Sequence, residues 1–71
     1  MEVKIMVEYY PAEDNRSGVK ADAWFMSAEF EQDDGDTLRL LADVPYFSKD
    51  EAAKDAEWLA SQIPGSVVEV E

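Results

Sequence analysis

Apolar and polar residues alternate along the first segment of the chain. In residues 2–10, every second position carries an apolar side chain, namely Val3, Ile5, Val7 and Tyr9. Alternation with a period of two, rich in β-branched residues, indicates a half-buried β-strand. Pro11 lacks an amide donor and is expected to end this strand. The polar segment that follows, residues 12–18, is rich in turn-forming residues and predicts a long loop.

Two further alternating segments, residues 20–32 and 37–44, predict a β-hairpin. A three-residue loop, Asp33–Gly35, pairs Phe30 with Leu38 and so keeps the apolar residues of both strands on one face. A two-residue turn mixes the faces, because a shift of one residue reverses every side chain. The three-residue loop also places Gly35 at the position that requires a left-handed backbone.

A helix is predicted to begin after Ser48. Ser48 and Glu51 form the pattern of a capping box, in which the serine hydroxyl accepts a hydrogen bond from the backbone of the third helical residue. An apolar stripe follows at helical spacing: Ala52, Ala53, Ala56, Leu59, Ala60 and Ile63. Its many alanines predict a close approach between helix and sheet. Pro64 and Gly65 are expected to end the helix, and residues 67–70 to form a last strand.

The element order is therefore β-β-β-α-β. We expect an α+β fold in which one helix packs on one face of a four-stranded, mostly antiparallel sheet, with residues 1–71 forming a single compact domain. A helix that crosses back over the sheet should set the last strand parallel to the third strand. The preferred strand order is 4-1-2-3, and the alternative is 1-2-3-4.

Charge is the unusual feature of the composition. The chain has 17 acidic and 6 basic residues, a net charge of −11, and neither cysteine nor histidine. Disulfides, zinc or haem sites with Cys or His ligands, and nucleophilic sites that need Cys or His are thereby excluded. No apolar run approaches the roughly 18 residues of a membrane span. The segment Met1–Lys4 does not resemble a signal peptide, so we expect a cytoplasmic protein.

Carboxylates are the abundant reactive groups, but their pattern does not indicate an enzyme. A two-carboxylate hydrolase needs a cleft and one carboxyl group of raised pKa, which a chain of 71 residues with one helix does not readily provide. The turn at Asp33–Asp36 departs from the calcium-loop pattern, and the three glycines are isolated. We therefore expect no catalytic residue, metal or cofactor. The negative charge also disfavours direct binding to nucleic acid or to an anionic membrane.

The outer face of the predicted sheet, which the helix does not cover, combines apolar and acidic side chains. Glu29 lies opposite Arg39 there, which predicts a cross-strand ion pair. Trp24 falls on the apolar face and is assigned to the core, whereas Phe25 points outward. Trp58 lies on a flank of the helix, so Phe25 and Trp58 are the candidate apolar contacts with a partner. A face with apolar centres and an acidic rim suits a protein partner or a homodimer.

Carboxylates on alternate strand residues repeat at about 6.6 Å and can imitate a row of phosphates. A small, acidic chain without cysteine, with acidic stretches at residues 29–36 and 50–51, resembles the phage-encoded inhibitors that mimic DNA, including anti-CRISPR and anti-restriction proteins. This resemblance implies a stoichiometric inhibitor that occupies the nucleic-acid channel of a bacterial defence complex in the host cytoplasm. No motif is matched, so it transfers no functional residue.

The candidate site is assigned from the residues themselves. We expect a basic, nucleic-acid-binding protein or defence complex as the partner. The expected contact residues are the acids of the hairpin and outer face with two aromatic residues at the edge: Glu29, Glu31, Asp33, Asp34, Asp36, Asp43, Phe25 and Trp58. The alternative is a housekeeping or halophile-adapted interaction module, or a homodimer, whose charge serves solubility.

Overall fold

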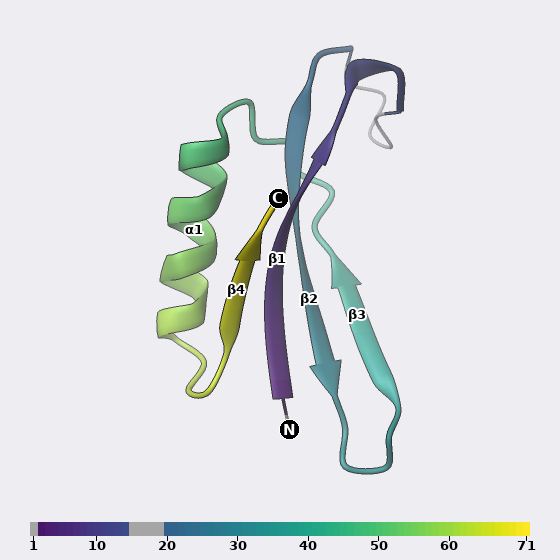
Figure 1. Ribbon diagram of the computed structural model, residues 1–71, viewed down its shortest axis with the longest axis vertical. Coiled ribbons are helices and arrows are strands. Elements are labelled where there is room, and N and C mark those ends of the chain that lie inside the picture. Colours follow the sequence, from purple (N-terminus) through teal and green to yellow (C-terminus); the bar gives the residue numbers. More distant parts are fainter. Residues whose placement is uncertain (1, 15–19) are drawn as a thin grey trace.

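The computed structural model describes residues 2–14 and 20–71, and the part of the predicted loop at residues 15–19 lies outside the described residues. The elements in chain order are β1 (Glu2–Tyr10), a short 3₁₀ helix (Ala12–Asp14), β2 (Ala23–Glu31), β3 (Thr37–Leu41), α1 (Lys49–Ser61) and β4 (Val67–Val70). They form one four-stranded mixed sheet and one long helix (Figure 1). The predicted α+β class and β-β-β-α-β order are confirmed.

The order of strands in the sheet is β3-β2-β1-β4, which is the preferred 4-1-2-3 arrangement. β1 pairs antiparallel with β2 and parallel with β4, and β2 pairs antiparallel with β3. β4 therefore runs in the same direction as β3, as expected of a helix that carries the chain back across the sheet. β1 and β2 are the central strands, while β3 and β4 form the two edges.

The predicted hairpin register is confirmed. Phe30 lies opposite Leu38, and the residues that close the loop are joined by a hydrogen bond of 2.8 Å from the amide of Gln32 to the carbonyl of Asp36. The loop thus consists of residues 33–35. Gly35 has a φ of 91°, the left-handed conformation that this turn requires and that disfavours a larger residue.

β2 begins at Ala23 rather than at residue 20, so the predicted strand was three residues too long at its start. The side chain of Asp22 instead accepts a hydrogen bond of 3.1 Å from the amide of Ala12, at the start of the 3₁₀ helix. An aspartate that satisfies a backbone donor of the adjacent turn competes with strand pairing. At its other end β2 stops at Glu31, one residue before the predicted end. Gln32 instead closes the hairpin loop.

β3 ends at Leu41 rather than at Val44, which corrects the other predicted boundary. Pairing with β2 continues to Ala42, whose amide bonds to the carbonyl of Met26, and resumes at Tyr46, which forms a bridge with Trp24. Uninterrupted register would set Trp24 opposite Val44, so the chain bulges by two residues here. The bulge contains Pro45, which has no amide hydrogen to donate to a ladder.

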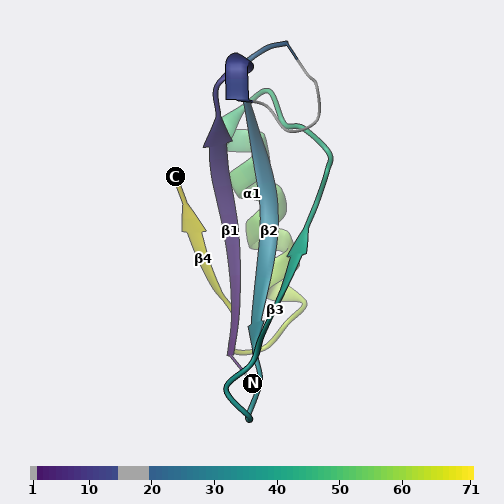
Figure 2. The same cartoon turned by 90° about the vertical axis from the view of Figure 1, so that its right-hand side faces the viewer.

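The core lies between the sheet and α1, which packs on β1, β2 and β4. Val3, Ile5 and Val7 of β1 are almost fully buried beneath Ala52 and Ala56 of the helix. Figure 2 shows α1 behind the central strands. Alanines at the contact let the helix approach closely, as the sequence indicates. Among the described residues, no helix has the length and apolar character needed to cross a membrane.

The ends of α1 follow the sequence signals. Ser48 is the N-cap residue with an extended backbone, and its hydroxyl accepts a hydrogen bond of 3.4 Å from the amide of Glu51. At the other end, the amide of Gln62 bonds to the carbonyls of Leu59 and Ala60. Gly65 then turns the chain into β4 with a φ of 81°.

Tyr46 joins the bulge to the helix. Its hydroxyl donates a hydrogen bond of 2.7 Å to the Asp55 carboxylate, and its ring packs against the core beside Trp24. This hydrogen bond, together with partial burial, raises the pKa of Tyr46 to about 12. Tyr46 thus ties the connection between β3 and α1 to both β2 and α1.

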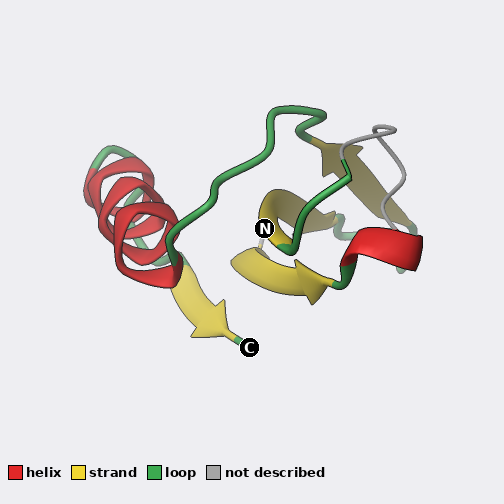
Figure 3. Ribbon diagram, turned by 90° about the horizontal axis from the view of Figure 1, so that it is seen from above, coloured by secondary structure: helices red, strands yellow, loops and turns green. Residues whose placement is uncertain are grey.

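α1 does not cover the whole face of the sheet. It lies on the β4 side, away from β3, in both Figure 1 and Figure 3. Leu38 and Leu40 lie on the same face of the sheet as the core but are 49% and 53% exposed. The sequence pattern assigns these leucines to the face that the helix covers. The structure confirms the face, but α1 does not extend over these two residues.

We predict that Ser48→Ala destabilises the protein by about 0.5–2 kcal/mol, because the Glu51 amide loses its acceptor at the helix start. Urea denaturation measures the change. Ser61→Ala is the matched control, since the Ser61 hydroxyl donates to the Trp58 carbonyl near the helix end and removes no N-cap. Equal midpoint shifts for the two variants would contradict the capping role.

We predict that the Tyr46 hydroxyl makes stability fall between about pH 10 and pH 12. Below the unfolded-state pKa of about 10, the hydroxyl is protonated in both states and contributes no pH dependence. Above it the unfolded chain loses the proton first, because the folded-state pKa is raised to about 12, so unfolding is favoured as pH rises. Urea midpoints of wild type and Tyr46→Phe from pH 9 to 12 test this, with Tyr9 and Tyr10 common to both. Parallel pH profiles would contradict it.

Candidate functional site: the acidic outer face and hairpin

The outer face of the sheet is the face opposite α1. Strand register assigns to it the side chains that alternate with those of the core, and acidic side chains outnumber basic ones among them. The members are Glu2, Lys4, Met6, Glu8 and Tyr10 of β1, Ala23, Phe25, Ser27, Glu29 and Glu31 of β2, Thr37, Arg39 and Leu41 of β3, and Val67 and Glu69 of β4. No helix of the described residues packs on this face.

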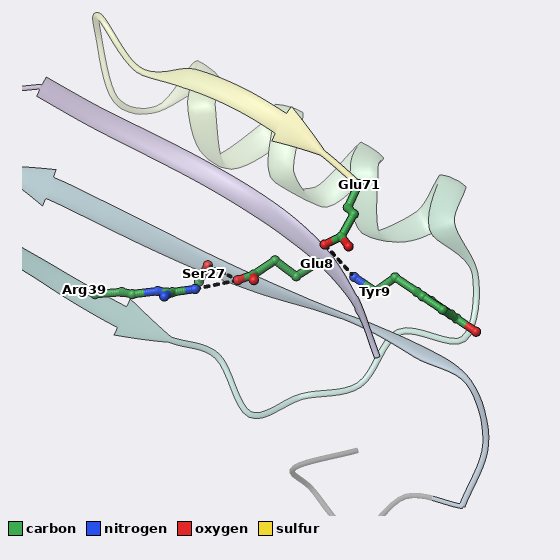
Figure 4. Close-up of polar contacts among 5 residues, drawn as sticks. All are labelled: Glu8, Tyr9, Ser27, Arg39 and Glu71. Carbon is green, nitrogen blue, oxygen red and sulfur yellow. Dashed lines mark hydrogen bonds and ion pairs between the residues drawn. The ribbon is translucent and has the colours of Figure 1, made fainter. Parts of the chain in front are cut away.

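Arg39 pairs with Glu8 and not, as predicted, with Glu29. The guanidinium lies 2.6 Å from the Glu8 carboxylate, which also accepts a hydrogen bond of 3.2 Å from the buried Ser27 hydroxyl (Figure 4). Arg39 does lie opposite Glu29 in the ladder, so the predicted register holds while the predicted ion pair is wrong. The Glu8 side chain is 29% exposed, and a partly sheltered carboxylate gains more from a cation than a fully exposed one does.

Lys4, the other cation of the outer face, is also paired. Its ammonium lies 3.6 Å from the Glu69 carboxylate on the neighbouring strand. Among the described residues, the two cations of this face therefore pair with acids near its centre and its β4 edge. The described side chains at the hairpin end of the face carry more acids than bases.

Three glutamates gather at that end. Glu2 lies directly opposite Glu31, and Glu29 lies one pair further along the same face. Together with Lys4 and Thr37 they line a shallow depression of about 100 Å³. Like charges directly opposite each other on two strands are destabilising, so the Glu2–Glu31 pair costs folding free energy.

The hairpin loop continues this acidic surface. Asp33, Asp34 and Asp36 are all exposed, and the amide of Asp36 donates a hydrogen bond of 3.0 Å to the Asp34 carboxylate. This short local bond and the turn at Gly35 hold the loop in a defined shape. Asp43, the sixth predicted acid, is exposed in the bulge beyond β3. It lies at the far end of that strand from the loop, so five of the six acids form one surface and Asp43 lies apart.

Phe25 does not serve as an exposed anchor. It lies on the outer face, as predicted, but it is 0% exposed and contacts the ring of Tyr10 edge to face, with ring centroids 5.3 Å apart. Ala23 and Ser27 beside it are buried too. The outer face therefore has a small apolar centre of its own at the end distant from the hairpin loop. The sequence could not predict this burial, because the alternation of apolar and polar residues in a strand indicates which face a side chain lies on but not which residues cover it.

Trp58 is 65% exposed but belongs to a different surface. It lies on α1, and α1 packs on the opposite face of the sheet from the five clustered acids. The structure thus separates Trp58 from the acids that it was expected to flank.

Sequence reasoning missed Glu8 as the partner of Arg39, and Ser27 as a second donor to the Glu8 carboxylate. Ser27 is a small polar residue that lies opposite Met6 and next to the acids of β2. This polar position in the strand is the local sequence signal for a polar contact there. Among the described residues, no three acidic side chains come together as a metal site. Partial burial, and a hydrogen bond with Asp22, raise the pKa of Tyr9, which lies on the helix face and not on this surface.

Comparison of the chain with protein-family models, with curated proteins and with solved structures found no match. The function of this surface therefore has to be argued from its own geometry and charge.

We predict that Glu31→Gln stabilises the protein by about 0.2–1 kcal/mol at low salt, because it relieves the repulsion with Glu2 across the strands. The gain should shrink as salt screens the two charges, and salt alone should raise the melting temperature of the wild type. Thermal and urea denaturation measure both effects. Glu57→Gln on the exposed side of α1 removes the same charge without a facing acid, and a gain as large as that of Glu31→Gln would contradict the pairwise repulsion.

Proposed function

We propose that this protein is a non-enzymatic interaction protein that binds a basic, nucleic-acid-binding protein or defence complex, and that it inhibits this partner stoichiometrically by presenting carboxylates in place of DNA phosphates. The observation that carries the proposal is the excess of acidic over basic side chains, among the described residues, on the surface formed by Glu2, Glu29, Glu31 and the hairpin loop. These acids lie on a sheet and a tight turn, which hold charges at fixed spacing.

The distribution of the cations supports this proposal. Lys4 and Arg39 lie on the same face, but Lys4 is paired with Glu69 and Arg39 with Glu8. A surface whose charge served solubility alone would gain stability from cations placed between Glu2 and Glu31. Keeping a repulsive pair that costs folding free energy is typical of functional surfaces, where stability is exchanged for binding.

The consequence for binding is electrostatic. A basic channel attracts this surface over a Debye length, and complementary charge raises the rate of association more than the strength of the final contact. Inhibition follows from occupation, because lysines and arginines that hold the acids of this protein are not available to phosphates. Each complex holds one or a fixed small number of inhibitor chains, and the chain itself undergoes no chemical change.

The proposal predicts that immobilised protein captures basic DNA-binding proteins from a bacterial lysate at low salt and that duplex DNA or high salt displaces them. Replacing the six acids Glu29, Glu31, Asp33, Asp34, Asp36 and Asp43 by their amides should abolish this capture with little effect on folding. The effect of each replacement should shrink as salt rises. Circular dichroism and urea denaturation check the fold of each variant.

A matched pair of variants separates location from total charge. Glu29→Gln/Glu31→Gln and Asp50→Asn/Glu57→Gln each remove two acids and change the net charge from −11 to −9. Only the first pair should weaken binding and competition with DNA. Equal weakening by both pairs, or unchanged binding after all six replacements, would contradict the proposal. The acidic surface would then serve solubility.

A further inference from the structure

The half of the sheet that α1 leaves bare forms an apolar groove. A helix is about 10 Å wide and neighbouring strands lie about 4.8 Å apart, so one helix covers about two strands of a sheet. A four-stranded sheet therefore has room for two helices on one face. α1 packs on β1, β2 and β4, and the face of β3 with the adjoining side of β2 is open.

The open position is lined by apolar side chains. Its floor is the face of β2 and β3 that carries Phe30 and Leu40, and its wall is formed by Leu59 of α1 and by Ile63, which follows the end of the helix. The groove has a volume of about 350 Å³ and is lined by Met26, Ser27, Ala28, Phe30, Leu40, Leu41, Ala42, Leu59 and Ile63. None of these lining residues is charged, in contrast to the acidic outer face.

We propose that this groove binds an amphipathic helix of another protein, with an apolar stripe flanked by lysine or arginine. The shape of the site favours a helix, because the groove follows β3 and has the strand face as its floor and Leu59 of α1 at its side. The five residues of β3 span about 17 Å, which matches about 11 residues of a helix. Such a helix inserts side chains at i, i+3 or i+4, and i+7.

Charge determines the chemistry of the flanks. Asp33, Asp34 and Asp36 lie at the hairpin end of the groove, Asp43 at the other end of β3, and Asp55 on the adjoining side of α1, where Tyr46 binds it. The nearest cation on β3, Arg39, points to the opposite face and is held by Glu8. An apolar floor between acidic ends is complementary to a basic amphipathic helix.

A second copy of the chain fits this groove poorly. Its one long helix already buries Ala52 and Ala56 in its own core, and its acids would add a second charge of −11. The groove does not use Glu29 and Glu31, which lie on the opposite face of the sheet, but it shares the aspartates of the hairpin loop with the proposed function.

The probe is a synthetic helical peptide of about 14 residues with a leucine stripe and lysine at all other positions. The control peptide has the same composition with the leucines spread around the helix. We expect the striped peptide to bind at least about tenfold more tightly than the control at moderate salt, measured by calorimetry, because only a stripe can fill the groove. Equal affinities would overturn the proposal, because charge alone would then explain binding.

Two variants of similar exposure locate the peptide. Leu40, 53% exposed, lines the groove, whereas Val67, 49% exposed, lies on the outer face at the opposite edge of the sheet. Leu40→Gln should weaken the striped peptide about tenfold and Val67→Gln should leave its affinity unchanged. Equal effects would overturn the proposal. Glu29→Gln/Glu31→Gln should preserve the preference for the striped peptide even if it abolishes capture of DNA-binding proteins, so the two proposals fail separately.

Amide exchange distinguishes a helix in the groove from a strand added at the β3 edge. The hydrogen bonds of Asp36 and Ala42 with β2 set the alternation, so the amides of Thr37, Arg39 and Leu41 face the free edge. A bound helix leaves their exchange fast while shifting the methyl resonances of Leu38 and Leu40. Protection of the three amides would show strand addition, and a dimer in sedimentation that Leu40→Gln dissociates would show self-association. Either result would overturn the proposal.

Discussion

The packing of α1 on β1 is the contact on which the other features of this fold depend. Val3, Ile5 and Val7 present one continuous apolar row, and Ala52 and Ala56 let the helix lie close against it. A helix centred on this row covers β4 and part of β2, and its width does not extend to β3. The same contact that builds the core therefore leaves Leu38 and Leu40 exposed. The described residues contain no second α-helix to cover them.

The β2–β3 hairpin consequently presents two unlike surfaces. On the outer face its carboxylates exceed the cations available to them, and on the helix face its leucines border an apolar groove. Within the described residues, β3 pairs with β2 alone and is tied to the helix through Tyr46 and the bridge to Trp24. Apolar burial stabilises this hairpin less than it stabilises β1. The hairpin is therefore the part of the fold where surfaces for other molecules cost the core the least stability.

Features set by local rules were predictable from the sequence, and features set by neighbours were not. The hairpin register follows from face matching and the need for glycine at residue 35, and the helix start follows from Ser48 and Glu51. The strand boundaries were less predictable, because Asp22 binds the amide of Ala12 and Pro45 interrupts β3 in ways that alternation does not encode. Alternation likewise placed Phe25 on the correct face without showing that it is buried there.

In the candidate site, too, the sequence predicts which residues carry charge but not which neighbours they contact. Counting acids on the hairpin predicts a negative surface, and the structure places five of the six together and leaves Asp43 apart. A count of acids cannot predict that Arg39 pairs with Glu8 instead of Glu29, because this pairing depends on the three-dimensional position of Glu8, whose carboxylate also accepts a hydrogen bond from Ser27. The choice of partner bears on the proposed function. A guanidinium bound to Glu29 would neutralise one of the acids at the hairpin end, whereas one bound to Glu8 stabilises the middle of the sheet and keeps Glu29 within the acidic surface on which the proposal rests.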